Sequence, residues 1–276
     1  MKNLLTAVFG ILCFTLFSCQ KEVDDIFKSN GSSTGTQLVK IVSKSGSDSS
    51  SLIFGYNSSN KLSTLNSSAT VSGIAASFSE RAERNAQGII QRIILKSDQY
   101  QQAGLDSVIT NILYGEGQYK AKVTLIDLGG GIGFIDSTAL SYDGSGKVVR
   151  EDSYVGIAGI YDTVSKVEYT YNGNNIALMK NYSYDPSTGL YELEETYSYD
   201  QYDDKLSPMY FGMEAFVFSS PLFYSSNNPI KSSLTTQGST ITYSVTYTYN
   251  SFNKPVSATS IVQPGNTSST GTYYYQ

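Results

Sequence analysis

A short tyrosine-rich unit recurs along this chain of 276 residues at nearly constant spacing. In its clearer copies Tyr precedes an Asp or Asn, and Gly or Asn follows within about four residues, as in Tyr142-Asp143-Gly144-Ser145-Gly146. The Asp or Asn markers stand at positions 57, 85, 143, 172, 200 and 250, with a weaker copy near 115. From 57 to 200 they are 28 to 30 residues apart. A period of this length indicates one supersecondary unit repeated side by side.

The residues between markers predict β-strands joined by tight turns. Tyr, Thr, Val and Ile alternate with polar residues, as in half-buried strands, while Asp or Asn with Gly supplies left-handed turn conformations. Asp-Ser or Asp-Thr pairs at 48–49, 106–107, 136–137 and 162–163 divide the period into two strands and two turns. Tyr at alternate strand positions projects to one face, so neighbouring hairpins are expected to form tyrosine ladders.

These patterns predict one all-β domain over residues 38–276, an antiparallel meander of seven or eight repeated hairpins. Right-handed twist is expected to roll so many strands into a half-shell or incomplete barrel. The gap between Asp200 and Asn250 breaks the period and holds three of the six prolines. We expect residues 207–231 to form a short helix and loop insertion on the concave face. A core plug and a mobile binding lid are both compatible with this segment.

The repeat resembles the YD-repeat (Rhs-type) hairpins, whose core is Tyr-Asp-x-x-Gly-apolar. Residues 142–148 carry that core most fully, and residues 56–62 carry a degenerate form. It is also similar to bacterial (Bacteroidota-type) surface lipoproteins with degenerate copies of the repeat. The resemblance implies a shell, spacer or adhesive surface and no catalytic activity.

The first residues predict export from the cytoplasm. After Lys2, the run from Leu4 to Phe17 is almost wholly apolar. It is shorter than the roughly 20 residues that a transmembrane helix needs, which favours a signal peptide. The run ends in Leu16-Phe17-Ser18-Cys19, which resembles the lipobox of bacterial lipoproteins. That resemblance implies a signal peptide over residues 1–18 and lipid on Cys19, so that the membrane is a partner through a lipid anchor.

The residues after Cys19 bear on localisation. Gln20, Lys21, Glu22, Asp24 and Asp25 resemble the export tag of Bacteroidota-type surface lipoproteins. The resemblance implies a lipid-anchored protein of the outer membrane that faces the cell exterior; a plain acidic tether on the periplasmic face is the alternative. Residues 26–37 are rich in Gly and Ser and are expected to be a flexible spacer, so residues 19–37 link the lipid to the domain.

Composition excludes several functional classes. The chain has no His, and of its two Cys residues Cys13 leaves with the signal peptide while Cys19 is lipidated. Imidazole or thiolate catalysis and disulfides are therefore not expected in the mature protein. The net charge of −5 does not resemble the basic field of a nucleic-acid binder. The glycine-rich residues 129–133 lack a following Lys-Ser/Thr, so we interpret them as a turn and expect no cofactor.

The densest acidic group lies at residues 192–204 and suggests two weaker hypotheses. Glu192 and Glu194 share a strand face, as a glycosidase pair would require. Asp200, Asp203 and Asp204 are a weak calcium candidate, because they lack the ordered spacing of a calcium loop. A solvated strand face explains the same residues.

Three Asp-Ser/Thr-apolar triplets resemble the O-glycosylation sequon of Bacteroidota-type exported proteins, which would place sugars on Ser107, Ser137 or Thr163. A turn role explains the same triplets.

Taken together, the sequence predicts a non-enzymatic surface lipoprotein that binds or scaffolds a protein or glycan through Tyr-rich strand faces. A glycan-acting hydrolase using residues 192–204 is the alternative. A transmembrane barrel is the rival architecture, but the alternate strand positions are mostly Ser, Thr, Asn and Lys rather than apolar.

Overall fold

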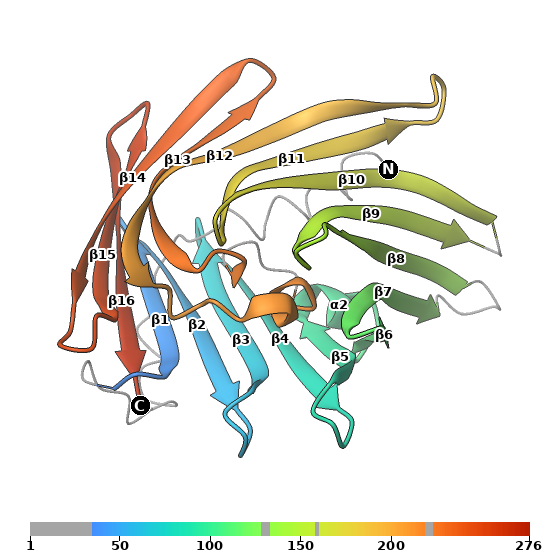
Figure 1. The fold of residues 1–276 in the computed structure, drawn as a ribbon, viewed down its shortest axis with the longest axis horizontal. Coiled ribbons are helices and arrows are strands. Elements are labelled where there is room, and N and C mark those ends of the chain that lie inside the picture. The colour runs from blue at the N-terminus through green and yellow to red at the C-terminus, as the bar shows by residue number, and fades with distance from the viewer. Residues whose placement is uncertain (1–34, 128–132, 158–159, 219–222) are drawn as a thin grey trace.

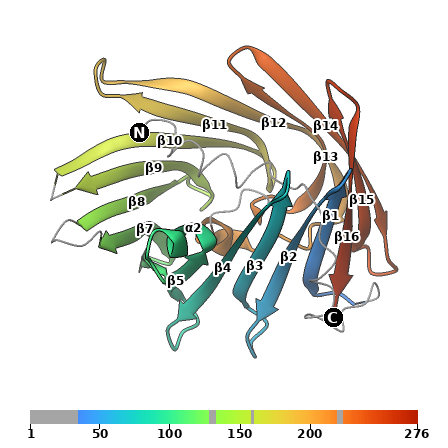
Figure 2. The same ribbon diagram turned by 180° about the vertical axis from the view of Figure 1, so that it is seen from behind.

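The computed structural model describes residues 35–127, 133–157, 160–218 and 223–276. The predicted signal peptide, Cys19, the export tag and most of the spacer lie outside these residues, as do residues 129–132 of the glycine-rich segment. The described residues form sixteen antiparallel strands, each paired with its neighbours in sequence, and β1 also pairs with β16. The sheet is therefore a closed barrel (Figures 1 and 2).

The strands of the first half are β1 (Leu38–Ser45), β2 (Asp48–Tyr56), β3 (Leu62–Val71), β4 (Ile74–Arg84), β5 (Ile90–Ser97), β6 (Val108–Gly115), β7 (Gln118–Asp127) and β8 (Gly133–Tyr142). Those of the second half are β9 (Val148–Ile157), β10 (Ile160–Asn172), β11 (Asn175–Asp185), β12 (Leu190–Leu206), β13 (Asn227–Thr236), β14 (Ser239–Tyr249), β15 (Pro255–Gln263) and β16 (Thr267–Tyr275). Two short helices interrupt them, α2 (Asp98–Gln102) and the 3-10 helix η1 (Gly212–Phe216). No helix among the described residues is long and apolar enough to cross a membrane.

The prediction of a half-shell or incomplete barrel is wrong. β1 and β16 pair along most of their length, from Leu38 opposite Tyr275 to Lys44 opposite Thr270. An open sheet would leave the N–H and C=O groups of both edge strands unpaired, and closure pairs them. The repeat predicts pairing between strands that are neighbours in sequence, and it carries no signal for pairing between the first strand and the last.

The barrel has two different ends. Even-numbered strands run toward the end that we call the floor, which holds the turns at 57–61, 85–89, 143–147 and 250–254. The opposite end, which we call the mouth, holds the turns at 46–47, 72–73, 186–189 and 237–238. The helix α2 also lies at the mouth, where the side chain of Ser97 caps it by accepting from the Tyr100 N–H. The sequence reading missed this helix.

The repeat marks the floor turns. In each of the four, the side chain of the marker accepts from the backbone N–H groups two and four residues later; for Asp143 these are Ser145 and Lys147, at 2.8 and 3.0 Å. The other three markers are Asn57, Asn85 and Asn250. The position three residues after each marker has positive φ, and Gly146 has φ 82°. These turns confirm the hairpin reading. The copies near 115 and at Asn172 lie instead at the two-residue turns 116–117 and 173–174, and Asp200 lies inside the long strand β12 and marks no turn.

The tyrosines that precede the floor turns point inward and join neighbouring strands. The hydroxyl of Tyr56 donates to the carbonyl of Leu38 at 2.8 Å, and Tyr171 donates to Val148 at 2.8 Å. The same contact is made by Tyr142, Tyr202, Tyr247 and Tyr275 to carbonyls 18 to 26 residues earlier. A buried hydroxyl needs such a partner. The repeated tyrosines are therefore part of the core and are not an exposed binding face.

Residues 207–218 and 223–226, which we call the plug, cross the interior at the floor, where both views show them within the ring of strands (Figures 1 and 2). Phe216, Phe218 and Phe223 are at most 5% exposed and belong to the main hydrophobic cluster. Packing of this kind favours the core plug over the mobile lid. The helix is η1, which begins at Gly212, and the side chain of Ser207 accepts from the Met209 N–H at 3.3 Å.

Candidate functional site

The barrel interior is the candidate site, and strand register shows which side chains face it. Residues directly opposite each other in paired strands point to the same face. Ile93, Ile112 and Leu140 belong to the hydrophobic cluster and therefore face inward. The residues paired with them on the neighbouring strands, and those paired in turn with these, also face inward. Three inward rows start at these residues and run around β6 to β13.

These three rows are strongly acidic. The first leads from Ile93 through Thr110 and Thr124 to Asp136, Val155 and Asp162. The second leads from Ile112 through Lys122, Thr138, Ser153, Ser165 and Ser183 to Glu192. The third leads from Leu140 through Glu151, Val167 and Asn181 to Glu195 and Thr236. The rows carry five carboxylates and one ammonium group.

The single ammonium group of these rows anchors the plug. Lys122 donates to the carbonyl of Phe216 at 3.0 Å and lies 3.4 Å from Glu151 Oε2, and the Tyr169 hydroxyl donates to the other oxygen of Glu151. The Tyr169 ring also packs edge-on against Phe216. The charge of Lys122 is thus engaged at the inner surface of the plug.

Two further inward carboxyls have raised pKa values. Glu80 faces inward opposite Leu65, and burial raises its pKa to about 8 although Lys122 acts in the opposite direction. Its Oε2 is buried and makes no hydrogen bond within the described residues. Water reaches Asp136, yet the surrounding walls desolvate its carboxyl and raise its pKa. Both groups indicate an interior that disfavours uncompensated negative charge.

Accessibility of the inward face changes along the barrel axis. Near the floor, inward residues such as Leu62, Ile90 and Ile176 are at most 2% exposed. Toward the mouth, the inward residues Asp136, Asp162 and Glu192 are exposed to water. The interior is therefore filled at the floor and open to solvent at the mouth.

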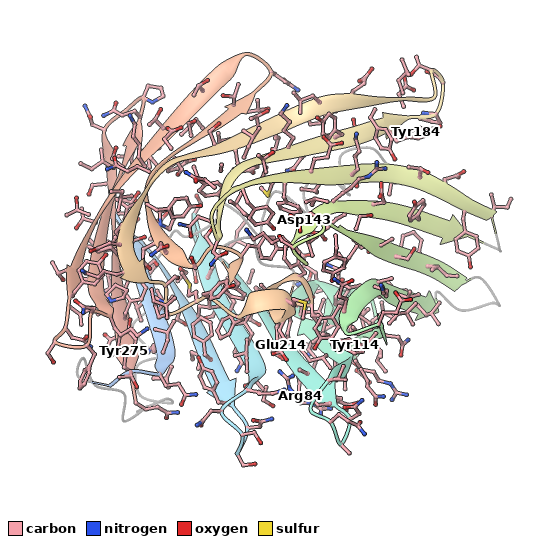
Figure 3. All side chains as sticks on the ribbon, viewed as in Figure 1. Arg84, Tyr114, Asp143, Tyr184, Glu214 and Tyr275 are labelled. Carbon is pink, nitrogen blue, oxygen red and sulfur yellow. The ribbon has the colours of Figure 1, made fainter. Side chains whose placement is uncertain are left out.

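The plug is latched to the wall at the floor by one buried ion pair. Arg84, whose side chain is 7% exposed, donates to both carboxylate oxygens of Glu214 at 2.6 and 2.8 Å. Arg84 also donates to the carbonyls of Leu62 and Gly88. Figure 3 shows Arg84 and Glu214 close together below the plug, with Tyr114 beside them.

A pocket of about 300 Å³ opens next to this latch. It is lined by Lys61, Gly88, Ile89, Tyr114, Tyr119, Phe211, Met213 and Glu214. Its charged groups already have partners, since Glu214 binds Arg84 and Lys61 donates to the carbonyl of Gly88 at 3.1 Å. We interpret the pocket as the seam between the plug and the wall.

The outer face of the barrel is polar over β14 to β16. Its exposed residues are mainly hydroxyl side chains, Ser244, Thr246, Thr248, Thr259, Ser268, Thr270 and Thr272, and they include one apolar residue, Ile261. Over β10 to β12 the outer face is aromatic instead. Lys166 lies 4.3 Å from the ring centroid of Tyr182 and 4.7 Å from that of Tyr191, which packs edge-on against Tyr184.

The acidic residues at 192–204 do not converge. Glu195 faces the interior, where Asn181 and Tyr197 donate to it, while Ser183 donates to Glu194. Asp203 accepts from the backbone and side chain of Asn228 and from Tyr249, and Asp204 pairs with Lys205. No three His, Cys, Asp or Glu side chains of the described residues are grouped as a metal site would require.

The three candidate O-glycosylation residues lie in different settings. Ser107 precedes β6, whereas Ser137 and Thr163 lie within strands on the outer face, both opposite Tyr154. Their neighbours Asp136 and Asp162 are strand residues that face the interior rather than turn residues. Because the sequence reading assigned these aspartates to turns, it missed the inward acidic rows; their shared position before a β-rich run was the available signal.

The described residues form a sixteen-stranded barrel whose floor is filled by the plug, and solved structures of similar fold are known. The crystal structure of a porin-like protein from Bacteroides uniformis ATCC 8492 matches 87% of this chain and 98% of its own, with 11% identity and a TM-score of 0.54. A porin-like protein from Bacteroides vulgatus ATCC 8482 matches 87% and 99%, with 13% identity and a TM-score of 0.53. At these identities the likeness shows the fold alone. No family model matches the sequence, and no curated protein does so.

Proposed function

We propose that this protein is a lipid-anchored binding barrel of the outer membrane whose body stands outside the bilayer and whose ligand enters through the mouth. In this proposal Cys19 carries the lipid and residues 20–25 direct the protein to the cell exterior. The porin-like name of the two similar structures supports an association with the outer membrane. The proposal includes no enzymatic activity.

The closed floor is the observation that carries the proposal. Phe218 and Phe223 of the plug are 1% and 0% exposed, and Arg84 holds Glu214 through two hydrogen bonds. Large buried aromatic side chains of this kind contribute several kcal/mol of stability, on the order of 3–5 each when truncated to Ala. A plug that is part of the core supports a cup rather than a channel.

The outer face over β14 to β16 supports a body outside the bilayer. A barrel that spans a membrane presents an apolar band about 25 Å tall, flanked by aromatic girdles. Here Thr246, Thr248, Thr270 and Thr272 stand exposed on the outside of β14 and β16. Hydroxyl side chains along this wall gain hydrogen bonds in water that acyl chains do not offer.

The full chain with Cys19→Ser tests this proposal. We expect the variant to lose fatty-acid labelling, to remain in solution without detergent, and to show the β-rich circular dichroism of the lipidated protein. We also expect no conductance steps from the lipidated protein in planar bilayers. A variant that stays in the membrane fraction or needs detergent, or a lipidated protein that conducts ions, would contradict the proposal.

The export tag is tested separately on intact cells. Replacing Gln20, Lys21, Glu22, Asp24 and Asp25 with Ala should preserve lipidation and protect the protein from added protease. Continued digestion of that variant on intact cells would show that these residues do not direct surface exposure.

A further inference from the structure

Three exposed carboxylates of the inward rows form no salt bridge within the described residues, although Lys122 acts electrostatically on Asp136. Asp136, Asp162 and Glu192 make no hydrogen bond or ion pair within the described residues and are exposed to water toward the mouth. The one ammonium group of these rows, Lys122, lies deeper, against Glu151 and the plug. Like charges held around one interior repel one another, so positive charge entering there is favoured.

Two buried acceptors of the interior also lack donors. Glu80 Oε2 and Asn181 Oδ1 are buried and form no hydrogen bond within the described residues. A buried acceptor without a donor destabilises a protein by about 1–3 kcal/mol. Both side chains face inward, Glu80 from β4 and Asn181 from β11.

The mouth combines this acidity with exposed apolar side chains. Ile74, Ile160 and Leu190 begin β4, β10 and β12 at the mouth and are 74%, 70% and 65% exposed. Large aliphatic side chains gathered at one end of a protein commonly mark an interaction site. The mouth therefore presents apolar side chains at its rim and carboxylates just inside it.

We propose that the mouth binds a cationic amphipathic peptide, with its Lys or Arg side chains toward Asp136, Asp162 and Glu192 and its apolar side chains against the rim. Charge complementarity selects this occupant. A metal ion has no apolar part for the rim, a polyamine carries only short methylene segments, and an anionic lipid or nucleic acid is repelled by the carboxylates. The inference rests on the proposal that ligands enter through the mouth.

The binding experiment uses full-length lipidated protein in phosphatidylcholine nanodiscs, with empty nanodiscs as the blank. The probe is a fluorescent amphipathic peptide of Leu and Lys residues, and the matched control peptide carries Glu in place of each Lys. We expect saturable binding of the Lys peptide, weakened by added salt because exposed charges are screened. We expect no binding of the Glu peptide.

Two charge-matched variants of the protein test where the peptide binds. The triple variant Asp136→Asn, Asp162→Asn, Glu192→Gln removes three inward carboxylates. The control Glu83→Gln, Asp200→Asn, Asp204→Asn removes three exposed carboxylates that lie elsewhere. We expect the inward variant to bind at least about tenfold more weakly, since three partly screened ion pairs are lost, and the control to bind as the wild type does.

A second pair of variants tests the rim. Ile160→Ser with Leu190→Ser should weaken binding several-fold, whereas Phe252→Ser, at a floor turn and 54% exposed in the wild type, should not. All variants are compared at equal folding, checked by circular dichroism.

Equal losses in the inward and control triple variants, equal binding of the two peptides, or no binding at all would overturn the inference. The proposed function has a separate readout, because the solubility of Cys19→Ser and the absence of conductance do not depend on the peptide. If the barrel is soluble and does not conduct but also does not bind the Lys peptide, the cationic amphipathic peptide is refuted as its ligand. The proposed placement of the barrel outside the bilayer would still stand.

Discussion

The floor and the mouth are built from the same sixteen strands of the described residues, yet they differ in almost every physical respect. At the floor, marker side chains close the turns, tyrosine hydroxyls join neighbouring strands, and the plug fills the interior. At the mouth, the turns at 46–47, 72–73 and 237–238 are only two residues long, inward carboxylates meet water, and Ile74 and Ile160 are exposed. The difference indicates that stability resides at the floor, which leaves the mouth available for binding.

The largest contrast between the two ends should come from truncating an apolar side chain. Phe223→Ala removes a ring that is 0% exposed, and we expect a loss of about 3–5 kcal/mol in the free energy of unfolding. Leu190→Ala at the mouth, where the side chain is 65% exposed, should change it by less than about 0.5 kcal/mol. Urea denaturation measures both, and similar losses would show that the two ends contribute equally to stability.

Removing the buried ion pair between Arg84 and Glu214 at the floor should give the next largest loss in the free energy of unfolding. Arg84→Met leaves the Glu214 carboxylate without its buried partner, which should destabilise the protein by about 3 kcal/mol. Arg81→Met removes the exposed pair with Glu83 on the same strand, and it should change stability by no more than about 0.5 kcal/mol. A small effect of Arg84→Met would mean that the plug does not depend on this pair.

Glu80 makes stability depend on pH. Because its pKa rises from 4.5 in the unfolded chain to about 8 in the folded protein, the folded state holds a proton that the unfolded state releases between these values. Stability should therefore fall as pH rises through this window, by at most about 1.4 kcal/mol for each pH unit. Glu80→Gln should flatten the dependence in thermal unfolding at pH 5 to 8, and an unchanged slope would contradict this assignment.

The smallest of these effects tests the floor turns. Gly146 has φ 82°, so Gly146→Val places a branched side chain in a left-handed conformation and should destabilise by about 1–2 kcal/mol. Gly144 lies in the same turn without positive φ and with open space at its Cβ position, so Gly144→Val is the matched control. Equal unfolding midpoints for the two variants would show that the positive φ three residues after the marker does not explain the spacing of the repeat.

The sequence predicted the floor far better than the mouth. Asp143 and its equivalents reveal their turns because a local side-chain hydrogen bond needs a fixed spacing of residues. The apolar residues of 207–231 indicated a plug, because such a segment must be buried. Closure between β1 and β16 depends on residues more than 200 positions apart, which no local pattern reports.

The inward carboxylates of the candidate site could not be predicted from the sequence for a related reason. Asp136 and Asp162 resemble turn residues in sequence, and only lateral register places them on the same inward row. The tyrosines were expected on exposed faces, but the direction in which Tyr171 points depends on which face of the sheet encloses the plug. Which face of the sheet encloses the plug depends on how all the strands close into the barrel.

The placement of the wall outside the bilayer is tested most directly by thiol labelling of Thr246→Cys in the lipidated protein on vesicles. The introduced thiol is expected to be the reactive one, because the proposal places the Cys19 sulfur in a thioether and removes Cys13 with the signal peptide. Thr246 is exposed on the outer face of β14, and Ser251→Cys in an exposed floor turn provides the reference. We expect a hydrophilic maleimide to label both at similar rates. A protected Thr246→Cys beside a reactive Ser251→Cys would place the wall among acyl chains and contradict a barrel that stands outside the membrane.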